Sequence, residues 1–313
     1  MTKALAVEFE GVTRRYGAVT AVNTLSFGVR EGEMFGLIGP DGAGKTTTIR
    51  LAGGLLRPDA GRVAILGRDP VAEHRAITAD VGYLSQRFSL YGDLTIDENV
   101  AFFAEIHGVK GYGPARDRLL EMTQLTEFRG RRADRLSGGM KQKLALACTL
   151  VHEPRVLLLD EPTTGVDPVS RREFWKLLSE FLARGLTIVM ATPYLDEAER
   201  CARVALLHEG RLLALDTPQQ LQAALAGQLL EVIAGTRSGD GGPTAILARV
   251  PGVTDVQTFG DRLHVRIAPG SDARAAADIA AALGAAGIAV TGIRPIAASL
   301  EDVFIDLITG RAT

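Results

Sequence analysis

A glycine-rich stretch is the part of this sequence whose residue types and spacing point most directly to chemistry. Residues 39–47 read Gly-Pro-Asp-Gly-Ala-Gly-Lys-Thr-Thr and directly follow the apolar run 34–38. A GxxxxGK[ST] pattern between a strand and a helix predicts a loop whose backbone N–H groups surround phosphate oxygens. The positive end of the following helix favours the same anion, Lys45 is placed to reach the terminal phosphates, and Thr46 to ligate magnesium. The expected phosphate-binding residues are Gly39, Pro40, Asp41, Gly42, Ala43, Gly44, Lys45, Thr46 and Thr47.

Two acidic residues follow a second apolar run. Residues 156–159 are all apolar, and Asp160 and Glu161 come next. A continuous apolar run predicts a parallel strand buried on both faces, so the two carboxylates emerge at the carboxyl edge of the sheet, beside the phosphate loop. We expect Asp160 to hold magnesium through water and Glu161 to polarise the water that attacks the phosphate. Taken alone, the pair is more typical of a capped strand end; the other motifs give it the catalytic interpretation.

A third stretch combines a serine N-cap with two glycines. Residues 136–143 read Leu-Ser-Gly-Gly-Met-Lys-Gln-Lys and open a helix with apolar residues on one face. Ser137, Gly138 and Gly139 therefore predict a second helix end that binds an anion.

From about residue 4 to about residue 225, the chain closely resembles the ATP-binding cassette family, the ATPase subunits of ABC transporters. The LSGGQ motif of that family is matched at residues 136–140, except that Met140 replaces the glutamine. The resemblance implies that this motif caps the ATP held by the opposite subunit. The cofactors are then ATP and Mg²⁺, and the catalytic unit is a pair of ATPase subunits, either identical or different.

The resemblance implies roles for three further positions. Tyr16 stands where the family stacks an aromatic ring on adenine, although an ordinary tyrosine at a strand end is the alternative. Gln86 resembles the glutamine that contacts magnesium and the attacking water and relays motion to the membrane subunit. Asp167 resembles the loop aspartate that communicates across the dimer, and a helix N-cap before Pro168 is a compatible second role. The expected catalytic residues are then Glu161, Gln86 and Lys45, and the expected metal ligands are Thr46, Gln86 and Asp160.

One position departs from the family pattern in a way that affects the chemistry. The switch histidine corresponds to Pro193, which has neither a hydrogen-bond donor nor a titratable group. We expect Thr192 to cap the next helix, with Pro193 at its first position and Glu197 in its opening turn, so that the fold survives. Loss of one preorganised donor costs roughly 3 kcal/mol of transition-state stabilisation, on the order of a hundredfold in rate. Hydrolysis is therefore expected to be slow, unless a neighbouring group such as Thr192 or Tyr194 substitutes.

Asp41 is a second departure, because the family more often has asparagine there. A carboxylate about 8 Å from a polyanion, at an effective dielectric constant near 40, weakens binding by on the order of 1 kcal/mol. The alternative is that Asp41 points to solvent and only stabilises the loop.

The order of predicted elements indicates an α/β fold built on a P-loop NTPase core. Short strands around residues 7–9 and 21–29 predict a flanking antiparallel β layer. Residues from about 87 to 150 read as a mainly helical arm, with a helix at 96–107. Residues 1–226 are thus expected to form the nucleotide-binding domain.

The following residues, 227–313, predict a small α+β domain of split βαβ, ferredoxin-like type. The expected elements are strands at 229–234, 253–258, 263–267 and 288–293, helices at 244–250 and 272–283, and a hairpin turn at Gly260-Asp261. The terminal run Ser-Leu-Glu-Asp-Val-Phe at 299–304 resembles the tail of exporter ATPases that include the daunorubicin-resistance group. Without that context it reads as a capped amphipathic helix.

Composition and charge argue against several other classes of protein. The net charge of −2 gives no field that collects nucleic acid. No uncharged run of about 18 apolar residues occurs, so a membrane role requires integral membrane permease subunits as partners. The N-terminal residues lack the apolar stretch of a secretion signal, and Cys148 and Cys201 do not have the spacing of a zinc site. We expect a cytoplasmic protein, peripheral on the inner face of the cell membrane.

These observations together predict the ATP-hydrolysing subunit of an ABC-type exporter. The alternative is a regulatory or assembly ATPase outside transport, which acts mainly through nucleotide binding. Pro193 makes that alternative credible, whereas the lack of basic extensions argues against a ribosome-acting protein.

Overall fold

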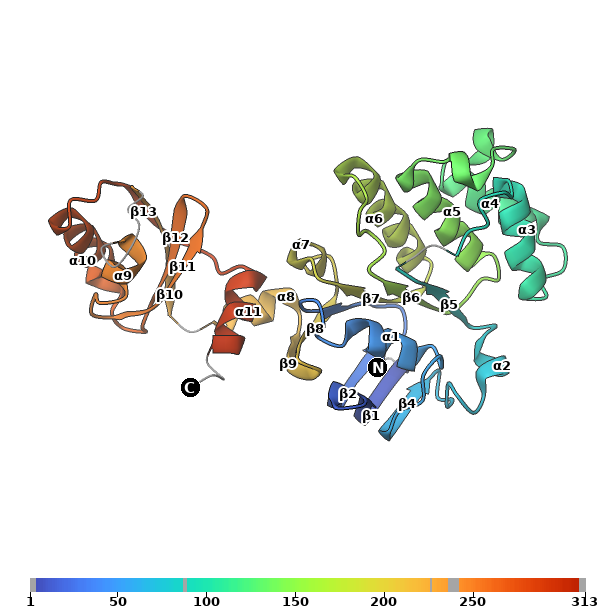
Figure 1. Ribbon diagram of the computed structural model, residues 1–313, viewed down its shortest axis with the longest axis horizontal. Coiled ribbons are helices and arrows are strands. Elements are labelled where there is room, and N and C mark those ends of the chain that lie inside the picture. The colour runs from blue at the N-terminus through green and yellow to red at the C-terminus, as the bar shows by residue number, and fades with distance from the viewer. Residues whose placement is uncertain (1–3, 87–88, 226, 236–241, 310–313) are drawn as a thin grey trace. The chain divides into compact units, whose positions relative to one another are not determined.

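A computed structural model describes residues 4–86, 89–225, 227–235 and 242–309 of the chain (Figure 1). The chain divides into two compact units, Met1–Pro218 and Gln219–Thr313. The division precedes the boundary expected after residue 226, because nearly all of helix α8 (Pro218–Ala223) groups with the second unit. No helix in the described ranges is long and apolar enough to cross a membrane.

The first unit is built on a six-stranded sheet in the order β5-β6-β7-β3-β8-β9. All neighbouring strands are parallel except the last pair, β8 and β9. The strands are β3 (Met34–Ile38), β5 (Val81–Leu84), β6 (Val156–Asp160), β7 (Thr187–Thr192), β8 (Arg203–His208) and β9 (Arg211–Asp216). Every residue of β3, β6 and β7 is buried, as the apolar runs 34–38 and 156–159 predicted for β3 and β6. The segments that follow these three strands therefore meet at one edge of the sheet.

An antiparallel sheet in the order β2-β1-β4 forms a second layer. Its strands are β1 (Leu5–Tyr16), β2 (Val19–Arg30) and β4 (Ala60–Ile65). Strands β1 and β2 are longer than the short strands predicted, and their antiparallel pairing continues through several shifts of register. Helix α1 (Lys45–Ala52) packs against β6 and β7 of the central sheet and also against β2 and β4.

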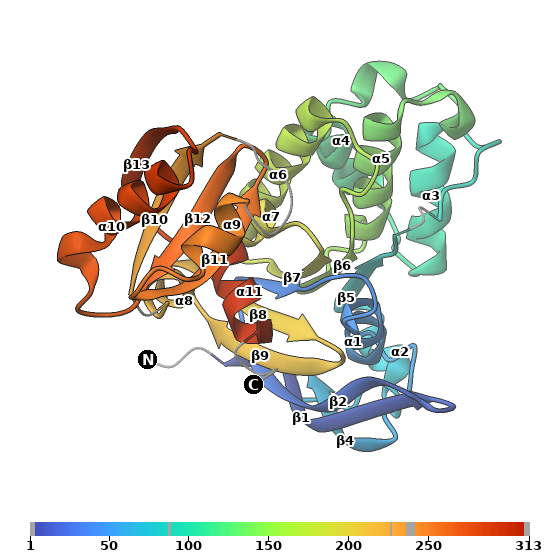
Figure 2. The ribbon, with the colours of Figure 1, turned by 60° about the vertical axis from the view of Figure 1, so that its left-hand side comes forward.

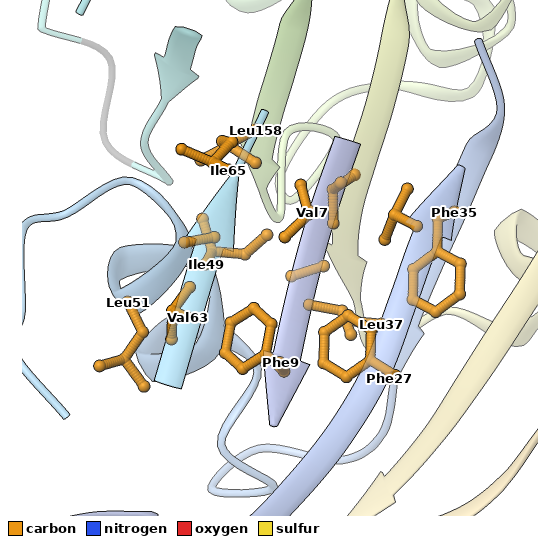
Figure 3. Close-up of a cluster of buried hydrophobic side chains, with 14 of the residues drawn as sticks. Val7, Phe9, Phe27, Phe35, Leu37, Ile49, Leu51, Val63, Ile65 and Leu158 are labelled. Carbon is orange, nitrogen blue, oxygen red and sulfur yellow. The ribbon is translucent and has the colours of Figure 1, made fainter. Parts of the chain in front are cut away.

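The core between these layers contains stacked phenylalanine rings among aliphatic side chains (Figure 3). The rings of Phe9 and Phe27 stack with centroids 4.6 Å apart, and those of Phe27 and Phe35 with centroids 5.4 Å apart. Ile49 of α1 and Leu158 of β6 belong to the same buried cluster. This cluster fixes the start of α1, and hence the glycine-rich loop, against both sheets.

The remaining helices of the first unit include the expected arm. They are α2 (His74–Ile77), α3 (Ile96–Ile106), α4 (Gly113–Met122), α5 (Gly138–Leu150), α6 (Pro168–Ala183) and α7 (Leu195–Ala198), with 3₁₀ turns η1 (Thr126–Phe128) and η2 (Ala133–Arg135). A capping box between Thr95 and Glu98 starts α3, and α5 packs against α3 and α4. Ile106, the last residue of α3, is exposed.

The second unit has the ferredoxin-like topology that the sequence predicted. Its sheet has the order β11-β12-β10-β13, with every neighbouring pair antiparallel. The elements are β10 (Gln228–Ala234), α9 (Pro243–Leu247), β11 (Val253–Phe259), β12 (Arg262–Ile267), α10 (Asp272–Ala285), β13 (Val290–Ile296) and α11 (Leu300–Thr309). Phe259 pairs with Arg262, which confirms the two-residue turn at Gly260-Asp261. Helices α9 and α10 lie together against the sheet (Figure 2).

The terminal helix α11 belongs to the opposite face of that sheet. Leu263, Val265 and Ile267 of β12 are buried in the cluster that includes residues of α9 and α10. Their neighbours on β12 point the other way, where His264 meets Asp302 at 2.9 Å and Arg266 meets Asp306. The Ser-Leu-Glu-Asp-Val-Phe run is thus a capped helix held to the sheet through its acidic residues.

Candidate active site

The glycine-rich loop connects β3 to α1 at the carboxyl edge of the central sheet. Gly44 is the N-cap of α1 with φ of 97°, a conformation that favours glycine. A Cβ at Gly44 would lie 2.3 Å from the Ala21 carbonyl oxygen, and one at Gly39 would lie 2.2 Å from that of Leu207. The loop therefore fits between β2 and β8 only because these two positions lack side chains.

Backbone carbonyl oxygens of the glycine-rich loop hold the Lys45 side chain in place. Its side chain is 3% exposed, and its Nζ donates to the carbonyl oxygens of Gly39 at 2.9 Å and Pro40 at 3.0 Å. The same nitrogen lies 3.3 Å from Glu161 Oε1. An ammonium group oriented in this way needs little rearrangement to meet a terminal phosphate.

Glu161 follows β6 with φ of 50°, in the left-handed region that non-glycine residues rarely adopt. Its Oε2 accepts hydrogen bonds from Gln86 Nε2 at 3.1 Å and Thr164 Oγ1 at 3.4 Å. The Lys45 contact to the other oxygen completes this arrangement. The strained backbone and three contacts aim one carboxylate at the point where the glycine-rich loop ends.

Thr46 and Asp160 form the oxygen pair expected to bind metal. Thr46 Oγ1 donates to Asp160 Oδ1 at 2.8 Å. Burial raises the pKa of the Asp160 carboxyl, the hydrogen bond from Thr46 opposes that change, and the charge of Glu161 adds to it. A hydroxyl and a carboxylate at this separation are ligands of the kind that Mg²⁺ prefers, so the residues fit that ion.

A cleft of about 770 Å³ opens above these residues. It is lined by Tyr16, Val19, Thr20, Ala21, Asp41, Gly42, Gly44, Lys45, Thr46, Thr47, Gln86, Glu161, Thr164, Pro193, Tyr194 and Glu209. Tyr16 stands at its rim, 45% exposed, with the Arg14 guanidinium 5.1 Å from the ring centroid. The Asp41 side chain is 95% exposed, as the solvent-facing alternative predicted, and its Oδ1 lies 4.0 Å from Lys45 Nζ. The volume is ample for a nucleotide.

The serine-glycine motif and Asp167 are not among the residues that line this cleft. Ser137 is the N-cap of α5, and its Oγ accepts from the Met140 N–H at 3.3 Å. Asp167 is the N-cap of α6 and accepts from the N–H groups of Val169 and Ser170. Both predicted caps are confirmed. Their placement away from the cleft agrees with a role toward a second subunit.

The segment at Pro193 differs from the prediction. Helix α7 begins at Leu195 with Tyr194 as N-cap, so Pro193 is not its first residue and Thr192 is not its cap. Instead, Thr192 Oγ1 accepts from the Tyr194 N–H at 3.1 Å and donates to Glu197 Oε2 at 2.7 Å. Thr192 is fully buried and its one O–H is donated to Glu197, so it cannot replace a histidine as a donor to the phosphate.

Tyr194 is the other neighbouring group. It is half-buried, lines the cleft beside Pro193, and carries the Arg171 guanidinium 5.0 Å from its ring centroid. It therefore remains available as a partial substitute.

Sequence reasoning missed several residues of this site. Thr164 supports Glu161, and its position three residues after that carboxylate was the available signal. Gln142 of α5, fully buried, donates to the Pro162 carbonyl oxygen at 2.5 Å, and nothing in its local sequence predicted this contact. Glu209 lies at the turn between β8 and β9.

The parallel sheet, the glycine-rich loop on α1 and the acidic pair after β6 define a P-loop nucleotide-binding cassette. Comparison with known proteins agrees. The family described as ABC transporter matches residues 22–164, and the family described as ATP-binding protein DrrA1-3-like, C-terminal domain matches residues 217–308. The chain belongs to the ABC transporter ATP-binding proteins.

The share of each relative's length that this chain matches differs between relatives. The probable multidrug ABC transporter ATP-binding protein YbhF of Escherichia coli (strain K12) is 42% identical over 313 residues, which cover 98% of this chain and 53% of that protein. The chain thus spans about half the length of YbhF. The daunorubicin resistance ATP-binding protein DrrA3 of Streptomyces coeruleorubidus is 36% identical over 306 residues, covering 96% and 95%. A dimeric bacterial ABC transporter cassette, MJ0796, is similar in structure with a TM-score of 0.61 and 26% identity, covering 67% of this chain and 98% of that one.

Proposed function

We propose that this chain binds and hydrolyses ATP as the ATPase subunit of an ABC-type export pump and drives separate membrane-spanning subunits. The observation that carries the proposal is the contact between Lys45 Nζ and Glu161 Oε1, 3.3 Å apart at the mouth of the glycine-rich loop. It brings a phosphate-binding cation and a candidate general base to one point of the cleft.

The residues support a simple division of roles. Backbone N–H groups of residues 39–47 and the Lys45 ammonium bind the phosphates, and the ring of Tyr16 stacks on the base. Thr46, Asp160 and Gln86 would hold Mg²⁺, which supplies charge neutralisation on the phosphates when bound. Glu161 takes a proton from water as the water oxygen bonds to the terminal phosphorus. The bond from that phosphorus to the bridging oxygen breaks, and ADP leaves with the electron pair.

We further propose that a second ATPase subunit completes the site. Ser137 and Gly138 are exposed at the start of α5, where Gly139 is buried, and Asp167 caps α6; none of the four lines the chain's own cleft. A helix N-terminus offers N–H groups to an anion, so these residues suit the phosphates held by a partner. The dimeric MJ0796 cassette shows that relatives of this fold pair. The two subunits are either identical or different.

Hydrolysis at this site is proposed to be slow because Pro193 offers no donor to the terminal phosphate. We expect Pro193→His to raise kcat at least severalfold, toward the hundredfold that one preorganised donor is typically worth. The matched control is Pro193→Ala, which removes the ring without adding a donor and should not raise kcat. Both are measured as phosphate release in the assembly extracted gently from its native membrane.

Two outcomes would contradict this reading. If Pro193→His and Pro193→Ala have equal kcat, the missing histidine does not limit the rate. If Tyr194→Phe in the parent lowers kcat further, Tyr194 already supplies the donor.

The same extraction separates the exporter from the alternative function. An export subunit copurifies with integral membrane permease chains, and the name of YbhF, a probable multidrug ABC transporter ATP-binding protein, supports that expectation. A regulatory or assembly ATPase, which a weak hydrolytic site also suits, would be recovered with soluble partners alone.

A further inference from the structure

Glu197 is a buried acidic residue that the chemistry described above does not use. It lies on α7, is 1% exposed and does not line the nucleotide cleft. No lysine, arginine or histidine in the described part of the chain forms an ion pair with it. A carboxylate buried without a cation is unfavourable unless hydrogen-bond donors face it, and a position that only needed filling would favour an apolar side chain. The hydrogen-bond donors that face the Glu197 carboxylate therefore indicate what it does in the structure.

Both donors are threonine hydroxyls, one in the loop after β6 and one on the last residue of β7. Thr163 Oγ1 donates to Glu197 Oε1 at 2.5 Å, and Thr192 Oγ1 donates to Oε2 at 2.7 Å. Thr163 comes two residues after Glu161, and Thr192 immediately precedes Pro193. One carboxylate therefore joins the loop after β6 to the loop after β7.

Each loop has a reason to need such a link. Glu161 has a left-handed backbone, which persists only when its surroundings hold it. The other loop contains Pro193, which contributes neither an N–H nor a polar side-chain atom. Its turn is closed by the Tyr194 N–H, which donates to Thr192 Oγ1 at 3.1 Å. Without Glu197, the two loops lose their side-chain connection and keep the backbone hydrogen bond from the Glu161 N–H to the Ala191 carbonyl oxygen, at 2.9 Å.

We propose that Glu197 is a positioning residue for ATP hydrolysis, which acts through Thr163 on Glu161 and through Thr192 on the Pro193–Tyr194 turn. It touches neither nucleotide nor water. This inference rests on the proposed ATPase function, because it concerns the rate of that reaction. Its effect falls on kcat more than on ATP affinity, since the glycine-rich loop and Lys45 are held by other contacts.

The test removes one hydroxyl at a time with little change of shape. We expect Thr163→Val and Thr192→Val each to lower kcat by about tenfold or more, because a misplacement of about 1 Å near the chemistry can cost on the order of a hundredfold. The Kd for MgATP should stay within about twofold of the parent. Thr163→Ser, which keeps the hydroxyl, should restore most of the rate. The double Val variant should lose less than the product of the two single losses, because both act through one carboxylate.

The matched control is Thr123→Val. Thr123 is equally buried and donates only to carbonyl oxygens of its own helix, away from the cleft. Urea unfolding, followed by the fluorescence of the single tryptophan, Trp175, reports the stability of each variant. If Thr163→Val keeps the parental kcat, or if it and Thr123→Val lose kcat equally, the positioning role is refuted. A parent without MgATP hydrolysis refutes the proposed function first and this inference with it, so the two failures are distinguishable.

Discussion

Two stacked histidines make the stability of the first unit depend on pH. The rings of His107 and His152 lie 3.8 Å apart and 2° from parallel, at the ends of α3 and α5. His152 Nε2 lies 3.3 Å from the Val81 carbonyl oxygen, and its Nδ1 is buried without a hydrogen-bond partner. Burial, with a smaller contribution from the charge of His107, lowers the pKa of His152 to about 4, and burial also lowers the pKa of His107.

The lowered pKa values of these histidines destabilise the folded state at acid pH. The unfolded chain takes up a proton near the ordinary histidine pKa of about 6.5, whereas folded His152 resists protonation down to about pH 4. The unfolded state binds more protons in this window, so the free energy of unfolding falls as the pH falls. A shift to about 4 corresponds to a loss of about 2 kcal/mol between pH 7.5 and pH 5. Solvent reaches part of the ring, which reduces this to about 1 kcal/mol.

The assay is urea unfolding at pH 7.5 and pH 5, followed by Trp175 fluorescence, which reports only on the first unit because it is the one tryptophan of the sequence. With a slope of about 2–3 kcal/mol per molar urea, the expected loss moves the midpoint by roughly 0.4 M. His152→Gln keeps a donor near Val81 but cannot titrate, and should remove that part of the pH dependence. His74→Gln replaces an exposed histidine and is the control. Parallel pH dependence of the parent and His152→Gln would refute the reasoning.

Two further predictions concern packing in each unit. Gly139→Ala should lower the free energy of unfolding of the first unit by about 1–3 kcal/mol, because the new Cβ would lie 2.2 Å from Ser170 Oγ. In the control Gly138→Ala, the new Cβ meets nothing within 4 Å, so the free energy of unfolding should change by less than about 0.5 kcal/mol. Urea unfolding followed by Trp175 fluorescence measures both variants, and equal effects would contradict the clash. Asp302→Asn should loosen the attachment of α11 to the sheet, because the buried Asp302 carboxylate accepts hydrogen bonds from Ser299 and His264. Amide hydrogen exchange in α11 should be faster in this variant than in the control Glu301→Gln, which changes an exposed residue. Unchanged exchange would show that Asp302 does not hold the helix.

Features carried by local sequence could be predicted. The buried parallel strands follow from continuous apolar runs, the caps at Ser137 and Asp167 from side chains that reach their own backbone, and the ferredoxin-like topology from the order of its elements. The glycine-rich loop follows from a motif whose spacing has one geometry. In each case the determining residues are neighbours in the chain.

Features that depend on distant contacts could not be predicted. Glu197 reads as an exposed acid in the opening turn of a helix, where it would favour the helix dipole, yet it is buried because Thr163, far away in the sequence, meets it across β6 and β7. Gln142 gives no local sign that it contacts the Pro162 carbonyl oxygen. The start of α7 was misplaced for a local reason, because the Thr192 hydroxyl accepts from the Tyr194 N–H and donates to the Glu197 side chain, and the helix begins only at Leu195.

The fold of the turn at Pro193 does not depend on the side chain at position 193. Thr192, Tyr194 and Glu197 close the turn through side-chain and backbone hydrogen bonds that need nothing from residue 193. A proline fits there without loss to the fold, because it follows the last residue of β7 and precedes the helix. The phosphate loop, Lys45 and the Thr46–Asp160 pair depend on other contacts. Proline at position 193 is therefore expected to leave ATP binding and closure onto a partner subunit intact while it lowers the rate of hydrolysis.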